Sequence, residues 1–332
     1  QRKLINNNLK MIKIFKTLLI NLTVLLVGLI LVEKLLPVIS LPIYSERTIN
    51  LREHSPNQNK TFTLNNTDKK INFFTNNDGF LNEDKNNIES VIIFLGGSTV
   101  ENIQLEYKDR FTYKLQSKLN NLGSVKTQVL NGGVSGSNNI NSLFSYLSKG
   151  LKYKPKYVFL MGTLNDVGQL SYYNSYWELD NNQSILNSSK SKLFLFLNYL
   201  KTYWFTNIYY HLKSIKIIPS KINENETKSG FNDFSTLEYI RVINLFNKIS
   251  EEFDIKFVFL TEPYLNIPDQ EKSIVESLNN IILESELNVI DLESLIPKKE
   301  KYFIDGTHLN SEGNELVSNI IFEKIKSLEL IK

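Results

Sequence analysis

Short, continuous apolar runs recur along this chain and alternate with longer segments of helical periodicity. The clearest run is Val91–Leu95, and similar runs occupy residues 129–130, 157–161, 257–260 and 289–290. A run of this length without a polar residue is typical of a strand that is buried on both faces. Between the runs, the spacing of apolar residues predicts helices over residues 109–121, 138–150, 235–252, 271–284 and 311–328. Strands that alternate with helices indicate an α/β fold, in which helices cover both faces of a parallel sheet.

Four short blocks of glycine and polar residues stand at the ends of these predicted elements. They are Gly96-Gly97-Ser98-Thr99, Asn131-Gly132-Gly133, Gly162-Thr163-Leu164-Asn165-Asp166 and Asp305-Gly306-Thr307-His308. The first three blocks directly follow predicted strands, and the fourth precedes the last predicted helix. Because ligand sites of open α/β sheets lie at the carboxyl ends of the strands, we expect the four blocks to meet at one edge of the sheet.

Ser98 stands at a predicted strand-to-helix turn, where its hydroxyl is exposed at the sheet edge. The chain has three histidines, and His308 alone belongs to one of the four blocks. Asp305 precedes it by three residues, so the carboxylate can reach the imidazole ring and hold its tautomer. Cysteine is absent, which excludes thiolate nucleophiles, disulfides and thiolate metal sites. These residues predict a Ser98–His308–Asp305 triad for acyl transfer.

Acyl transfer also needs hydrogen-bond donors directed at the developing oxyanion. We expect the backbone N–H groups of Ser98 and Gly133 and the side-chain amide of Asn165 to provide them. Asp305 and His308 would also suit half of a metal site, but no further histidine or cysteine joins them. We therefore predict neither a metal nor another cofactor.

In this order the four blocks resemble those of the SGNH, or GDSL-type, hydrolase superfamily, which is named for a Ser, a Gly, an Asn and a His. Ser98, Gly133, Asn165 and His308 match these four positions, and Asp305 matches the carboxylate that orients the base. The first block reads Gly-Gly-Ser, where the family name has Gly-Asp-Ser.

The resemblance covers residues 72–328 and extends to Asn77-Asp78-Gly79-Phe80, a feature similar to membrane-anchored bacterial members. It implies a flavodoxin-like, three-layer α/β/α domain that hydrolyses or transfers acyl esters.

The amino-terminal part of the chain differs in charge from the rest. Of the net charge of +3, residues 1–36 contribute +5, so the remainder is mildly acidic and lacks the basic surface that nucleic-acid binding needs. Residues 17–32 are almost wholly apolar. Lys16 and Lys34 can snorkel, and Leu35, Leu36 and Val38 extend the apolar segment to residues 17–38. The positive-inside rule then predicts a cytoplasmic basic tail over residues 1–16 and a transmembrane signal anchor over residues 17–38. A cleaved signal peptide and a buried helix are the alternatives.

We expect a polar stalk over residues 39–70 and the hydrolase-like domain over residues 71–332. Within that domain, residues 168–232 interrupt the alternation of strands and helices. They predict a helical insertion, which either packs on the domain or forms a lid over the site. The charge asymmetry places the domain on the periplasmic or extracellular side of a bacterial cytoplasmic membrane.

The predicted function is that of a single-pass, membrane-anchored serine esterase acting on acyl esters, O-acetyl esters in particular, of surface glycans or lipids. Its partners are then a small-molecule or glycan ester and the membrane, without nucleic acid. Two alternatives stay open at this point. One is an O-acyltransferase that uses the same residues on a polysaccharide acceptor, and the other is an anchored binding or scaffold protein without catalysis.

Overall fold

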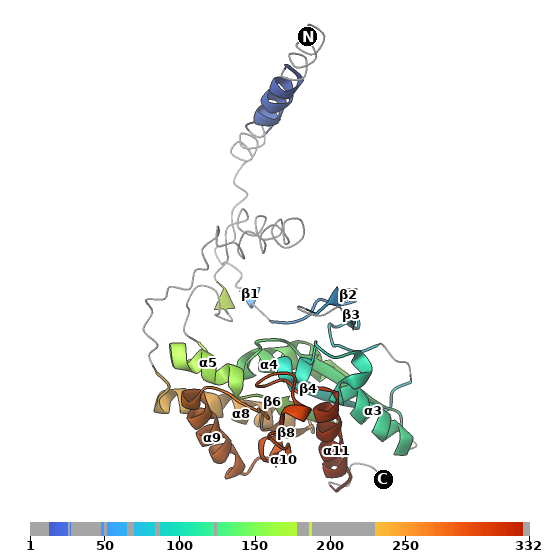
Figure 1. Cartoon of the computed structure of the whole chain (residues 1–332), viewed down its shortest axis with the longest axis vertical. Helices are drawn as coiled ribbons and strands as arrows, with labels where there is room; N and C mark the ends of the chain where they lie inside the picture. Colours follow the sequence, from blue (N-terminus) through green and yellow to red (C-terminus); the bar gives the residue numbers. More distant parts are fainter. Residues whose placement is uncertain are drawn as a thin grey trace. The chain divides into compact units, whose positions relative to one another are not determined.

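The computed structural model describes residues 13–25, 27, 48–49, 52–64, 70–83, 87–122, 125–177, 186–187 and 230–327 (Figure 1). The chain divides into two compact units, Gln1–Arg47 and Thr48–Lys332. In the first unit, residues 13–25 form an exposed helix. Within the described part of the chain, no helix is both long enough and apolar enough to cross a membrane. Much of the predicted anchor, at residues 26 and 28–38, lies outside the described residues.

Five parallel strands form the centre of the second unit (Figure 1). They are β4 (Ser90–Gly96), β5 (Thr127–Gly133), β6 (Tyr157–Met161), β8 (Lys256–Leu260) and β9 (Val289–Ile290). Their order in the sheet is β5-β4-β6-β8-β9, and each neighbouring pair is parallel. Counted along the chain this is the order 2-1-3-4-5 of flavodoxin-like folds. The predicted α/β fold with a parallel sheet is confirmed.

Helices cover both faces of this sheet, as Figure 1 shows. One face packs against α4 (Asn139–Ser145), α5 (Leu164–Tyr173), α8 (Asp233–Glu252) and α9 (Asp269–Leu283). The opposite face packs against α3 (Phe111–Leu122) and α11 (Ser311–Ser327). Because successive strand side chains point to opposite faces, the continuous apolar runs of the sequence contribute to both cores.

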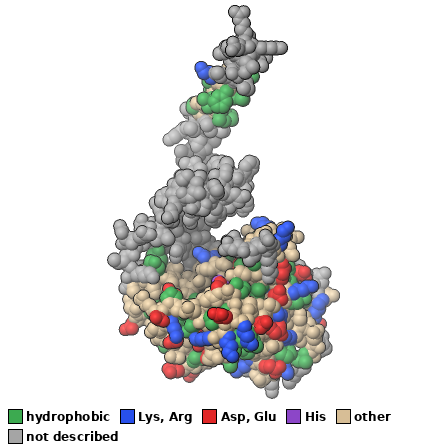
Figure 2. Space-filling model, viewed as in Figure 1, with side chains coloured by type: hydrophobic (Ala, Val, Ile, Leu, Met, Phe, Trp, Pro, Cys, Tyr) green, Lys and Arg blue, Asp and Glu red, His purple; other side chains and the backbone are tan. Residues whose placement is uncertain are grey.

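The remaining elements are short. They are β1 (Thr48–Ile49), β2 (Asn59–Thr63), β3 (Lys70–Phe74), β7 (Leu186–Asn187), α2 (Ser98–Glu101), α10 (Leu292–Leu295), a π-helical turn at Tyr146–Gly150, and 3₁₀ turns at Tyr107–Asp109, Leu151–Tyr153 and Glu300–Tyr302. Strand β2 pairs antiparallel with β3, and β1 pairs antiparallel with β7. On the face shown in Figure 2, basic and acidic side chains are interspersed over the described part of the second unit, so neither sign of charge dominates that face.

Two regions named in the sequence analysis are only partly described. Residues 48–49 and 52–64 of the predicted stalk belong to the same compact unit as the sheet. Of the predicted insertion, residues 178–185 and 188–229 lie outside the described residues. Its first residues, through Tyr173, complete helix α5 of the core.

The topology makes the carboxyl end of β4 the candidate position for a ligand site. The chain leaves β4 for β5 on one side and later returns to β6 on the other side. In open α/β sheets, the crevice at such a switch point is where ligands bind. Ser98 is the first residue of α2, and only Gly97 separates it from the end of β4.

Candidate active site

Ser98, His308 and Asp305 form one continuous chain of polar contacts. His308 Nε2 lies 2.8 Å from Ser98 Oγ, although the two residues are 210 positions apart in the sequence. On the other side of the ring, Nδ1 lies 2.8 Å from Asp305 Oδ2 and 3.0 Å from Oδ1. A neutral imidazole satisfies both neighbours when Nδ1 carries the proton and Nε2 accepts from the hydroxyl. The structure therefore brings the three predicted triad residues together.

A tight turn holds the Asp305 carboxylate in place. Its Oδ1 accepts the backbone N–H groups of Thr307 at 2.9 Å and of His308 at 2.8 Å. Partial burial raises the pKa of Asp305, but these two hydrogen bonds and the His308 ring outweigh the burial, and the net effect is a lowered pKa. The carboxylate is therefore ionised at neutral pH and can stabilise an imidazolium beside it.

The backbone N–H of Ser98 is available as a donor. In α2 the N–H groups of Val100 and Glu101 donate to Gly97 O, at 3.2 Å and 3.1 Å. The first N–H groups of a helix have no acceptor within the helix. Among the described residues none accepts from Ser98 N–H, so this part of the predicted oxyanion site is open.

The Asn165 side chain lies beside the nucleophile. Its Nδ2 donates to Ser137 O at 2.9 Å, and a Cβ on Gly97 would stand only 2.3 Å from that nitrogen. The amide is therefore packed against the backbone that leads into Ser98. A primary amide carries two N–H donors, and the hydrogen bond to Ser137 uses one of them. The second N–H is not used by any contact within the described residues and is available to a ligand.

Gly133 differs from its predicted role. Its N–H donates to Asn131 Oδ1 at 2.9 Å, so this donor already has an acceptor. A Cβ on Gly133 would lie 2.3 Å from the backbone nitrogen of Glu101, which shows that glycine is needed here for α2 to pack on β5. The structure thus argues against the Gly133 N–H as an oxyanion donor and gives the residue a packing role instead.

Gly136, unlike Gly133, has an N–H without an acceptor among the described residues. Residues Val134–Ser137 form a turn closed by a hydrogen bond of 2.9 Å from Ser137 N to Val134 O. The φ of +72° at Gly136 suits the third position of a type II turn, where glycine is favoured. Its N–H has no acceptor in the described part of the chain. The next residue, Ser137, is the one whose carbonyl Asn165 holds.

Glu262 is a site residue that the sequence analysis missed. This fully buried side chain accepts the Thr99 hydroxyl through Oε1 at 2.6 Å and the Leu164 N–H through Oε2 at 3.0 Å. Burial raises the pKa of Glu262, although both hydrogen bonds and the charge of His308 oppose that rise. Thr99 follows the nucleophile and Leu164 precedes Asn165, so one carboxylate joins the two segments. A single glutamate after a strand forms no motif, and the sequence contains no signal for it.

Asp166, next to Asn165, is also fully buried. Its Oδ1 accepts the Asn139 N–H at 2.9 Å and the Tyr176 hydroxyl. Burial raises the pKa of Asp166 from 3.8 to about 7, against the effect of these hydrogen bonds. The folded protein therefore keeps a proton that the unfolded chain releases. The stability this group contributes is complete below the unfolded pKa and is lost as the pH rises through the folded pKa.

This linkage predicts how the Asp166→Asn variant behaves. The amide keeps an oxygen for both hydrogen bonds but cannot ionise. We expect the urea midpoint of the wild type to fall more steeply than that of the variant between about pH 4 and about pH 7. The measurement is urea unfolding at several pH values. Parallel curves for the two proteins would show that Asp166 does not titrate in this range.

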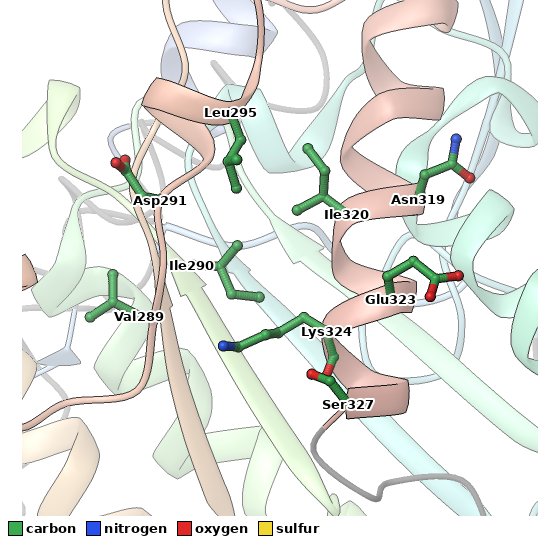
Figure 3. A pocket seen from close by; sticks show the side chains of 9 residues that line it. All are labelled: Val289, Ile290, Asp291, Leu295, Asn319, Ile320, Glu323, Lys324 and Ser327. Atoms are coloured by element: carbon green, nitrogen blue, oxygen red, sulfur yellow. The ribbon is translucent and has the colours of Figure 1, made fainter.

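A cavity of about 540 Å³ lies between β9 and α11 (Figure 3). It is lined by Val289, Ile290, Asp291, Leu295, Asn319, Ile320, Glu323, Lys324 and Ser327. None of these side chains belongs to the contacts around Ser98. Within the described ranges there is also no group of three His, Cys, Asp or Glu residues that could hold a metal ion.

Comparison with known proteins gives one family match and several similar folds. The model of the family described as GDSL-like lipase/acylhydrolase matches residues 92–321. No curated protein matches the sequence.

The solved structures that are similar to the chain include a lipase/acylhydrolase from Enterococcus faecalis. It shares 16% sequence identity with a TM-score of 0.45, and the match covers 73% of this chain and 97% of that one. Another is a catalytic mutant of the acetylxylan esterase Axe2 from Geobacillus stearothermophilus, with 11% identity, a TM-score of 0.45, and coverage of 72% and 94%. A third is a GDSL-like lipase from Bacteroides thetaiotaomicron, with 12% identity, a TM-score of 0.42, and coverage of 72% and 89%.

Proposed function

The chain belongs to the GDSL-like lipase/acylhydrolase family, and we propose that Ser98, His308 and Asp305 are the catalytic triad of this serine ester hydrolase. The observation that carries the proposal is the 2.8 Å contact between His308 Nε2 and Ser98 Oγ. The contacts from Nδ1 to the ionised Asp305 support it, because they fix the tautomer that a general base needs.

The proposed reaction has two halves. As Ser98 Oγ attacks the acyl carbon, its proton passes to His308 Nε2 and the carbonyl oxygen becomes an oxyanion. When the tetrahedral intermediate collapses, the bond to the alcohol breaks and His308 gives the alcohol oxygen its proton. Water then attacks the acyl-enzyme, with His308 again taking the proton, and Ser98 is regenerated. Asp305 stays ionised throughout and stabilises the imidazolium.

Three donors are proposed for the oxyanion: the N–H groups of Ser98 and Gly136 and the second N–H of the Asn165 amide. Gly136 replaces Gly133 in this assignment because its N–H is unoccupied, whereas that of Gly133 is bonded to Asn131. Removing one such donor typically lowers kcat by roughly 10²–10³.

The proposed substrates are small acyl esters, O-acetyl groups in particular, on surface glycans or lipids. Ser98 and His308 are both partly exposed, so a large alcohol portion can reach them from solvent. We further propose that the apolar segment over residues 17–38 anchors the protein in a membrane with the catalytic unit outside the cytoplasm. Cell fractionation tests the anchor, because release of the protein into the soluble fraction without detergent would contradict it.

A series of p-nitrophenyl esters tests the reaction and the acyl preference together. We expect acetate to be hydrolysed with the highest kcat/KM and longer chains progressively less well. Adding an acetylated polysaccharide, followed by analysis of the products, separates release of free acetate from transfer of the acetyl group to another hydroxyl. Transfer without release would assign the protein as an acyltransferase, and no reaction with any ester would refute the proposal.

A further inference from the structure

Three consecutive residues ahead of the family match contact the domain, and two of them, Arg52 and His54, contact the segments around Ser98. Arg52 Nη1 donates to Ser135 O at 3.1 Å, Glu53 lies 3.4 Å from Lys149 Nζ, and His54 Nε2 lies 2.9 Å from Glu101 Oε1. The family match begins only at residue 92, so this segment is an addition to the part of the fold that defines the family.

Arg52 contacts the Val134–Ser137 turn, which contains the proposed oxyanion donor Gly136. Ser135 O and the Gly136 N–H belong to the same peptide unit, and in a trans peptide these two groups point in opposite directions. The guanidinium therefore occupies the carbonyl side and leaves the N–H side open. A Cβ on Gly136 would stand 2.1 Å from Arg52 Nη1, so the cation packs directly against this glycine.

The side chain of Ser135 also forms a hydrogen bond that fixes the turn. Ser135 Oγ donates to Glu101 Oε2, and the other oxygen of this buried carboxylate faces His54. Glu101 ends α2, the short helix that begins with Ser98. Two contacts thus fix the turn at Ser135. Arg52 binds the Ser135 carbonyl, and Glu101 of α2 binds the Ser135 hydroxyl.

We propose that Arg52 is a positioning residue that orients and polarises the Ser135–Gly136 peptide for oxyanion binding. The inference rests on the proposed esterase function. A charge-assisted hydrogen bond to a carbonyl draws electron density toward the oxygen, which makes the N–H of the same amide a stronger donor. A stronger N–H donor stabilises the substrate oxygen most when negative charge develops on it. The Arg52 contact should therefore stabilise the transition state more than the bound substrate.

The test compares Arg52→Gln, Arg52→Lys and the matched control Glu53→Gln, which lies on the same segment but contacts Lys149 instead of the turn. With p-nitrophenyl acetate as a neutral substrate, we expect Arg52→Gln to lower kcat roughly tenfold, less than loss of a whole donor, with KM nearly unchanged. Arg52→Lys restores part of kcat because it keeps the positive charge. Glu53→Gln keeps wild-type kinetics.

A boronic acid that forms a tetrahedral adduct on Ser98 gives a second readout. Its inhibition constant should rise in Arg52→Gln by the same factor as kcat falls, while the thermal midpoint matches that of Glu53→Gln. An unchanged kcat in Arg52→Gln, or an equal loss of kcat in Glu53→Gln, would overturn the inference and leave the esterase proposal intact. A loss confined to KM for an anionic ester would overturn it too, by showing that Arg52 binds substrate. Absence of hydrolysis by the wild type would refute both proposals.

Discussion

Replacement of Ser98 by alanine should abolish ester hydrolysis while leaving the fold intact. Among the described residues, the Ser98 hydroxyl is the one in contact with His308 Nε2, and its loss should lower kcat on the order of 10⁴–10⁶-fold. The folded structure loses little, because Ser98 is the first residue of α2 and alanine suits a helix. His308 is partly exposed, so water can take the place of the lost hydroxyl at Nε2.

The measurement combines p-nitrophenyl acetate hydrolysis with labelling by a fluorophosphonate probe. In the wild type we expect Ser98 Oγ to attack phosphorus with departure of fluoride, and in Ser98→Ala we expect no label. Ser148→Ala is the matched control, because Ser148 is exposed and distant in sequence from all four blocks. Ser98 would not be the nucleophile if Ser98→Ala kept more than a few per cent of the wild-type rate of hydrolysis. Labelling at another serine would contradict the assignment in the same way.

The sequence predicted the sheet and the proximity of Ser98, Asp305 and His308 because both depend on local patterns. The runs that became β4, β6 and β8 are buried on both faces, so every residue in them is apolar and the pattern is unambiguous. Asp305 and His308 lie three residues apart in one turn, so the spacing alone brings the carboxylate to the ring. Ser98 reaches them through the parallel topology, which collects strand ends at one edge.

The structure favours Gly136 over the predicted Gly133 as the proposed donor because the two glycines of this segment differ in their surroundings. Gly133 ends β5 and lets α2 approach, which is a long-range packing requirement. Gly136 lies in the Val134–Ser137 turn, where its positive φ suits glycine, and its N–H has no acceptor among the described residues. Glu262 and Arg52 were missed for another reason. Each acts through long-range contacts, Glu262 to Thr99 and Leu164 and Arg52 to Ser135, and such contacts leave no periodic trace in the sequence.

Replacement of His308 by alanine should cost as much activity as loss of the nucleophile. Without Nε2 to accept its proton, the Ser98 hydroxyl is a weak nucleophile at neutral pH, and kcat should fall on the order of 10⁴–10⁶-fold. Fluorophosphonate labelling should slow in parallel, because it needs the same activation. The Asp305→Asn variant should lose less activity than His308→Ala. The backbone still holds His308 in place, but the carboxylate that fixes the tautomer of its ring is gone.

The decisive comparison for His308 is the double variant Ser98→Ala/His308→Ala. If the two residues act as one unit, removing the second after the first costs nothing further, and the double variant should match either single variant. The rate that remains above the uncatalysed reaction then belongs to the donors of Ser98, Gly136 and Asn165, which neither substitution removes. Additive losses in the double variant would mean that His308 acts independently of Ser98. In that case the 2.8 Å contact would be structural, and the general base would have to be sought elsewhere.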